Sequence, residues 1–110
     1  MIHIQNNDLS CLKDKECYLL FYFTASWCGP CQSIKSFIEE LSGKLDQSKI
    51  EICKIDFDQN KALAKNAGVR SIPTFILFKN KKRISSYSGA NKEKISELIK
   101  SISENEPNSI

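Results

Sequence analysis

The stretch YLLFYFTASWCGPC, residues 18–31, decides how this 110-residue chain folds. Its first six residues, Tyr18 to Phe23, form a continuous apolar run, which is typical of a strand covered on both faces of a sheet. Two cysteines, Cys28 and Cys31, follow where the strand gives way to a helix. Pro30 suits the first turn of that helix, because no backbone N–H is needed there and proline already has a helical φ. We therefore expect the strand to lead directly into the helix and to present both cysteines at the edge of a sheet.

The rest of the chain predicts alternating strands and helices around this stretch. We expect further strands over residues 1–5, 50–56, 74–78 and 83–88, and helices over residues 8–15, 30–45, 61–67 and 95–102. Strand–helix–strand units favour parallel neighbours with right-handed crossovers, and the last two strands favour an antiparallel hairpin. The sequence therefore predicts an α/β fold, in which a mixed sheet carries helices on both faces. We expect one domain over residues 1–103 and a frayed polar tail over residues 104–110.

The composition argues against two classes of partner. The formal net charge is +3, which is too small to indicate a nucleic-acid-binding protein. No apolar run approaches the roughly 20 residues that a membrane-spanning helix needs, so we expect no membrane partner. The first ten residues, MIHIQNNDLS, lack the basic region, apolar stretch and cleavage site of a secretion signal. We therefore expect a soluble cytoplasmic protein.

The spacing of Cys28 and Cys31 suits thiol–disulfide exchange, which needs two thiols with different tasks. One thiol attacks a substrate disulfide as a thiolate, and the other resolves the mixed disulfide that results. At a helix N-terminus, free N–H groups and the positive end of the dipole favour a thiolate at Cys28, which we assign as the nucleophile. Cys31 lies about one turn later and is assigned as the resolving thiol. Gly29 and Pro30 set the turn between them, and Trp27 is expected to cover one side of the site.

Two other interpretations of these cysteines stay open at this stage. A C-x-x-C pair also forms half of a structural zinc site, but zinc needs four ligands. The chain has no second C-x-x-C pair and a single histidine, His3, so we expect no metal. Alternatively, both cysteines are ordinary core residues, which the adjacent Trp, Gly and Pro at a strand-to-helix junction disfavour. Among the other cysteines, Cys17 and Cys53 are expected in the core, and Cys11 is expected to be partly exposed.

The chain resembles the thioredoxin family over nearly its whole length. The similarity is carried by short motifs in the family's order and spacing: WCGPC at residues 27–31, KID at 54–56, IPT at 72–74, FKN at 78–80, and Gly89. The resemblance implies the thioredoxin fold, an α/β architecture in which a central mixed five-stranded sheet is flanked by four helices. Gly-Pro between the two cysteines resembles the reducing members of the family rather than the oxidising or isomerising ones.

The resemblance also implies a substrate-binding surface beside the cysteine pair. It places Pro73 after a cis peptide bond, where it faces the two thiols and helps to keep metal away from them. Ile72 would offer its backbone to an extended substrate segment, as an added strand does, and Trp27 and Gly89 would line the same groove. From the residues alone, Pro73 could equally form a rigid trans turn at a strand start, and Gly89 could simply end a strand.

One departure from the family concerns the proton chemistry of Cys31. Members usually have a buried Asp five residues before the motif tryptophan, where this chain has Tyr22, whereas the partner lysine is kept as Lys54. The resemblance gives both positions a supporting role. Loss of a negative charge favours thiolates, but loss of a base slows deprotonation of the resolving thiol. Tyr22 could position a water or bond a sulfur, or it could be only a core aromatic. Asp56 and Asp58 could supply negative charge near the site, or could be ordinary loop residues.

The function that the resemblance implies is that of a protein-disulfide reductase and electron carrier. Reduced Cys28 and Cys31 would reduce disulfides in targets such as peroxiredoxins or ribonucleotide reductase, and an NADPH-dependent thioredoxin reductase would restore them. We expect a monomer that holds no cofactor, because the sequence contains no glycine-rich nucleotide-binding motif. The alternative is a thioredoxin-like binding module or subunit in which redox activity is secondary.

Overall fold

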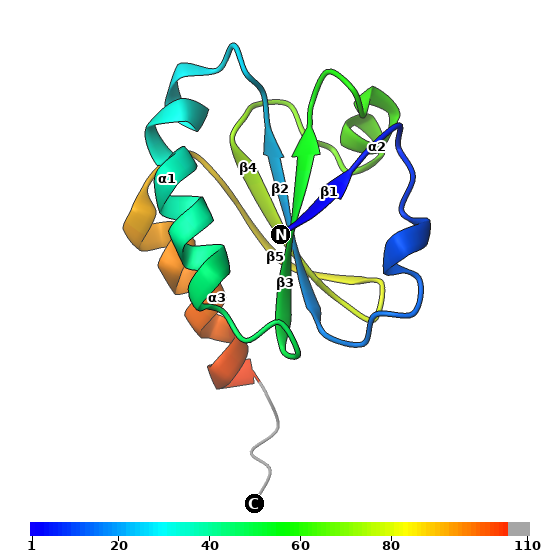
Figure 1. The fold of residues 1–110 in the computed structure, drawn as a ribbon, viewed down its shortest axis with the longest axis vertical. Coiled ribbons are helices and arrows are strands. Elements are labelled where there is room, and N and C mark those ends of the chain that lie inside the picture. The colour runs from blue at the N-terminus through cyan, green and yellow to red at the C-terminus, as the bar shows by residue number, and fades with distance from the viewer. Residues whose placement is uncertain (106–110) are drawn as a thin grey trace, which may run out of the picture.

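The computed structural model describes residues 1–105, and its five strands form a single mixed sheet (Figure 1). The strands lie in the order β1-β3-β2-β4-β5, with β1 and β2 parallel to β3, β4 antiparallel to β2, and β5 antiparallel to β4. This is the mixed five-stranded sheet that the sequence predicts. The strands are β1 (Ile2–Ile4), β2 (Tyr18–Thr24), β3 (Ile50–Asp56), β4 (Thr74–Lys79) and β5 (Lys82–Ser88); the helices are α1 (Gly29–Lys44), α2 (Lys61–Asn66), α3 (Lys92–Asn105) and the 3-10 helix η1 (Ser10–Leu12).

The central strand β2 is buried on both faces, as its continuous apolar run predicts. Leu20 and Tyr22 belong to the core on the face that α1 and α3 cover, whereas Phe21 and Phe23 belong to the core under η1 and α2. Figure 1 shows α1 and α3 together on one side of the sheet and α2 on the other. Successive side chains of a strand point to opposite faces, so β2 needs an apolar residue at every position to serve both cores.

The prediction of a helix over residues 8–15 is wrong, and the described chain has three α-helices where the resemblance implied four. Only the three-residue 3-10 helix η1 forms there. The Asp8 carboxylate accepts the backbone N–H of Ser10 over 2.9 Å, which closes a local turn instead of starting an α-helix. Just upstream, Asn7 is tied to α2, because its side-chain oxygen accepts the backbone N–H of Leu63. An eight-residue helix gains little stability on its own, so these contacts decide the local structure.

The C-terminal helix α3 extends beyond the predicted domain boundary at residue 103 and runs to Asn105. The rest of the predicted tail, residues 106–110, lies outside the described residues. At the β4–β5 turn, Asn80 and Lys81 both have a positive φ, which matches a two-residue hairpin turn whose twist suits the two strands. Over residues 1–105, the structure contains no helix whose length and apolar character would let it cross a bilayer.

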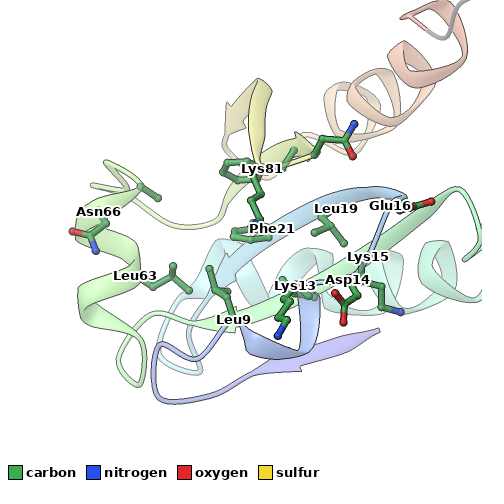
Figure 2. A pocket seen from close by; sticks show the side chains of 14 residues that line it. Leu9, Lys13, Asp14, Lys15, Glu16, Leu19, Phe21, Leu63, Asn66 and Lys81 are labelled. Carbon is green, nitrogen blue, oxygen red and sulfur yellow. The ribbon is translucent and has the colours of Figure 1, made fainter.

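A cavity of about 900 Å³ lies between η1, α2 and the β4–β5 turn, on the face of the sheet that η1 and α2 cover. Figure 2 shows the side chains that line it, among them Leu9, Phe21 and Leu63. No sequence pattern indicates this cavity, because its apolar lining comes from segments that are far apart along the chain. Neither Cys28 nor Cys31 lines it.

Candidate active site

The two cysteines lie where the sequence predicts, at the start of α1. Cys28 and Cys31 form a disulfide, and their Cα atoms are 5.2 Å apart. Cys28 is the N-cap residue of α1 and has extended backbone angles, with φ −88° and ψ 111°, while Pro30 falls in the first turn. Cys28 exposes only 5% of its surface and Cys31 exposes 0%. Cys28 therefore offers a small exposed surface to a reacting sulfur on a partner, whereas Cys31 offers none.

The helix N-terminus supplies the electrostatic conditions for a thiolate at Cys28. The backbone N–H of Cys31 donates to Cys28 Sγ over 3.2 Å, and the first turn of α1 contains no acidic residue. When the disulfide is reduced, a negative charge on Cys28 Sγ strengthens this hydrogen bond and is favoured by the helix dipole. Both effects lower the free energy of the thiolate relative to the thiol.

The segment before β4 packs directly against Cys28. The Ile72–Pro73 peptide bond is cis, in agreement with what the resemblance implied. The backbone oxygen of Ile72 lies 3.7 Å from Cys28 Sγ. This contact puts the carbonyl of the half-buried Ile72 next to the reactive sulfur, where an extended peptide could pair with the backbone of Ile72 as an added strand does.

Trp27 forms one wall of a second cavity, which lies beside Cys28. Its side chain is 65% exposed, and its indole N–H donates to Asp58 Oδ2 over 2.6 Å. The cavity has a volume of about 350 Å³ and is lined by Trp27, Cys28, Gly29, Pro30, Phe57, Arg70, Ser71 and Ile72. Five of these residues were predicted from the sequence, whereas Phe57, Arg70 and Ser71 were not, because they belong to no motif. It placed Asp58 near the site but did not foresee that Asp58 fixes the ring of Trp27.

Gly89 supports the cis-proline segment. It follows β5 directly, and its backbone N–H donates to the carbonyl oxygen of Pro73 over 2.9 Å. Neither Gly89 nor Pro73 is among the residues that line the cavity next to Cys28. The structure therefore connects Gly89 to the site through Pro73, and its part in substrate binding stays a prediction.

We expect the Gly89→Ala variant to destabilise the fold by about 1–3 kcal/mol and to raise the KM for a protein disulfide, because the φ of +140° at this position strains any other residue. An added Cβ would also lie 2.5 Å from the hydroxyl of Tyr87. The free energy of unfolding in urea measures the loss of stability. Gly43→Ala is the matched control, since nothing lies within 4 Å of a Cβ at Gly43. Equal stability of the two variants would contradict the expected strain.

Tyr22 and Lys54 lie behind the disulfide, on neighbouring strands. They are register partners in the parallel β2–β3 pair. Tyr22 is 3% exposed, and its ring stacks on Phe75 with 5.0 Å between centroids and 2° between planes. Burial raises the pKa of the Tyr22 phenol above its ordinary value of 10. Together with Cys31, Tyr22 and the half-buried Lys54 line a cavity of about 180 Å³, so Tyr22 is both a core aromatic and a neighbour of the resolving thiol.

The other three cysteines are free thiols outside this site. Cys53 is buried, Cys17 is half-buried and Cys11 is exposed. Burial raises the pKa of the Cys53 thiol to about 12, which keeps it uncharged and unreactive at neutral pH. In the part of the chain that the structure describes, no three His, Cys, Asp or Glu side chains come together as a metal site.

Comparison with known proteins agrees with this geometry. The family model described as Thioredoxin matches residues 3–101. The chain belongs to the thioredoxin family. It is 42% identical to thioredoxin of Gallus gallus over 80 residues, which is 73% of this chain and 74% of that one. It is 37% identical to Thioredoxin-1 of Drosophila yakuba over 86 residues, or 78% of either chain.

Solved thioredoxin structures share the architecture. The X-ray structure of Fasciola hepatica thioredoxin superposes with a TM-score of 0.82 at 34% identity, covering 92% of this chain and 98% of that one. Reduced Schistosoma mansoni thioredoxin pre-protein gives a TM-score of 0.83 at 32% identity, with 92% and 96% covered. As a thioredoxin family member with the Cys28–Cys31 disulfide, this chain is a protein-disulfide reductase that acts by dithiol–disulfide exchange. Proteins of this family work with thioredoxin reductase and disulfide-containing targets.

Proposed function

We propose that this chain carries electrons from an NADPH-dependent thioredoxin reductase to disulfides in cytoplasmic target proteins, such as peroxiredoxins or ribonucleotide reductase. The observation that carries the proposal is the position of Cys28 Sγ, which caps α1 and lies 3.7 Å from the carbonyl oxygen of Ile72. An extended target segment paired with Ile72 would bring its disulfide to the one sulfur that the helix activates. Trp27, exposed beside this point, would cover the bound segment.

The exchange takes two steps and transfers two electrons. The Cys28 thiolate attacks one sulfur of the target disulfide, which forms a mixed disulfide and releases the other target sulfur as a thiolate. Cys31 then loses its proton and attacks Cys28 Sγ, which forms the Cys28–Cys31 disulfide and releases the second target thiolate. Because Cys31 is fully buried, its only accessible reaction is with Cys28. The reductase would reverse the process at the same pair.

The remaining cysteines support action in a reducing compartment. Cys11, Cys17 and Cys53 are free, and a chain kept with free thiols is typical of the cytosol, where disulfides rarely persist. We propose that the protein acts there as a monomer, which is the simplest form in which the opening at Cys28 stays accessible to targets of different shapes.

A coupled assay tests the electron source. The oxidised chain is mixed with thioredoxin reductase, NADPH and insulin, and NADPH consumption is followed by absorbance. We expect NADPH oxidation that rises in proportion to the concentration of the chain and stops when the reductase is omitted. If dithiothreitol drives insulin reduction through the chain but NADPH and the reductase do not, then the proposed partner is wrong while the reductase activity stands.

A further inference from the structure

The second step of the exchange requires a destination for one proton. Cys31 must become a thiolate before it attacks Cys28 Sγ, yet it exposes 0% of its surface and has no direct contact with bulk water. Burial in apolar surroundings disfavours the charged form of a thiol. A group close to Cys31 that takes the proton would therefore accelerate this step, as general bases do.

The cavity behind Cys31 contains one carboxylate. It has a volume of about 180 Å³ and is lined by Tyr22, Thr24, Ala25, Ser26, Cys31, Gln32, Lys35, Lys54 and Asp56. A liquid water occupies about 30 Å³, and a buried water needs two to four polar partners. The cavity is large enough, and polar enough along its lining, to hold water beside Asp56, and Cys31 forms part of the same wall.

The other polar groups of the cavity are poor proton acceptors. Burial raises the pKa of the Tyr22 phenol, so the phenol keeps its own proton at neutral pH. Lys35 and Lys54 are cations without an acceptor atom, and they favour a thiolate rather than take its proton. The Gln32 amide donates to backbone oxygens of the preceding loop over 3.3 Å. Hydroxyl and amide groups are also too weakly basic for this role.

Asp56 is held rigidly at the end of β3 and keeps one oxygen available. Its Oδ1 accepts the backbone N–H groups of Asp58, over 2.9 Å, and of Gln59, over 3.1 Å. Both bonds use Oδ1, so neither of them occupies Oδ2, the other oxygen of this cavity-lining residue. Asp56 is half-buried, so a proton that it accepts can pass on to solvent. The charged or titratable groups around it are Lys54 on β3, Lys35 on α1, Tyr22 on β2, Cys31, and Asp58 in the following loop.

We propose that Asp56 is the general base for Cys31 and acts through water in this cavity. The proton leaves Cys31 Sγ and reaches the Asp56 carboxylate, while the sulfur electron pair attacks Cys28 Sγ. The Cys28–Cys31 bond forms, the bond between Cys28 and the target sulfur breaks, and the target leaves with the electron pair as a thiolate. Asp56 then returns its proton to the leaving thiolate or to solvent. The inference rests on the reductase function and assigns a carboxylate route in a chain that has tyrosine at position 22.

The test is a single-turnover reaction of the reduced chain with a tryptophan-free peptide disulfide across pH. Trp27 is the only tryptophan, so its fluorescence reports oxidation of the adjacent pair, and acid quenching followed by mass analysis counts the mixed disulfide. Asp56→Asn removes the base but keeps an oxygen for the Asp58 and Gln59 N–H groups. We expect resolution to slow by about tenfold to a hundredfold between about pH 6 and 7, with the mixed disulfide accumulating, because a general base contributes at least that much. The resolution rates of the wild type and of Asp56→Asn should converge at high pH, where hydroxide takes the proton of Cys31.

Asp46→Asn is the matched control, since Asp46 also binds a turn N–H, that of Ser48, through Oδ1 but does not line the cavity. If Asp56→Asn folds poorly, Asp56→Ser provides a second variant with a side-chain acceptor and no base. Asp56 profiles that superimpose on the wild-type profile would overturn the proposal. If Tyr22→Phe changes the pH profile of resolution and Asp56→Asn does not, the phenol is the base and the proposal is overturned. If the wild-type chain itself leaves the peptide disulfide intact, the reductase function fails, which is a distinct result.

Discussion

The Cys28→Ser variant is expected to lose at least about a thousandfold of the insulin-reducing activity, the scale on which enzymes lose activity without their nucleophile. A serine hydroxyl cannot form a disulfide, and the N–H of Cys31, which lies 3.2 Å from Cys28 Sγ, then has no thiolate to stabilise. The fold should remain, because serine fits the N-cap position of α1 and accepts the same hydrogen bond. Turbidity of insulin in dithiothreitol measures the loss directly.

Two further variants show that the effect belongs to Cys28 itself. Cys11→Ser changes an exposed thiol outside the site and should leave the rate unchanged. Cys31→Ser should attack a target normally and then stop at the mixed disulfide, which mass analysis would detect as a stable adduct. Full turnover by Cys28→Ser would remove the basis of the assigned chemistry. A variant that keeps binding a partner while it loses turnover would favour the binding-module alternative for that partner.

The sequence predicts the elements around the cysteines well because their signals are local. The apolar run Tyr18 to Phe23 indicates a strand buried on both faces, and β2 has that burial. The expected strand over residues 50–56 has the same bounds as β3. Helix α1 begins next to Cys28, as Pro30 in its first turn indicates. In each case, periodicity or a single residue type reports the local backbone without knowledge of distant contacts.

Contacts between distant segments set the features that the sequence does not predict. The turn at Asp8, where a helix was expected, depends on Asn7 and its bond to the backbone of Leu63, 56 residues away. The fixed orientation of Trp27 depends on Asp58, 31 residues away. The cavity that both Cys31 and Asp56 line forms only when α1, β2 and β3 are packed together. None of these leaves a periodic pattern or a motif in the chain.

Asn60 shows how such a distant contact supports both the fold and the site. Its side chain is 0% exposed and forms hydrogen bonds with three backbone groups, of which the bond to Ile4 is buried and the other two are partly buried. Its side-chain nitrogen donates to the carbonyl oxygens of Ile4, over 3.2 Å, and Asp56, over 2.9 Å, while its side-chain oxygen accepts the N–H of Asn7 over 2.8 Å. One amide therefore joins β1, the end of β3 and the loop before η1.

We expect the Asn60→Ala variant to lower the free energy of unfolding by about 3 kcal/mol, because three hydrogen bonds to backbone groups are lost and each contributes about 1 kcal/mol. For a domain of this size, that change lowers Tm by about 12 °C or more. Thermal unfolding followed by circular dichroism measures it, and Asn66→Ala, at an exposed position of α2, should stay within about 1 kcal/mol of wild type. A Tm within a few degrees of wild type for Asn60→Ala would show that water replaces the amide. Because Asn60 donates to the carbonyl of Asp56, its loss should also loosen Asp56, which lines the same cavity as Cys31, and slow resolution in the folded fraction.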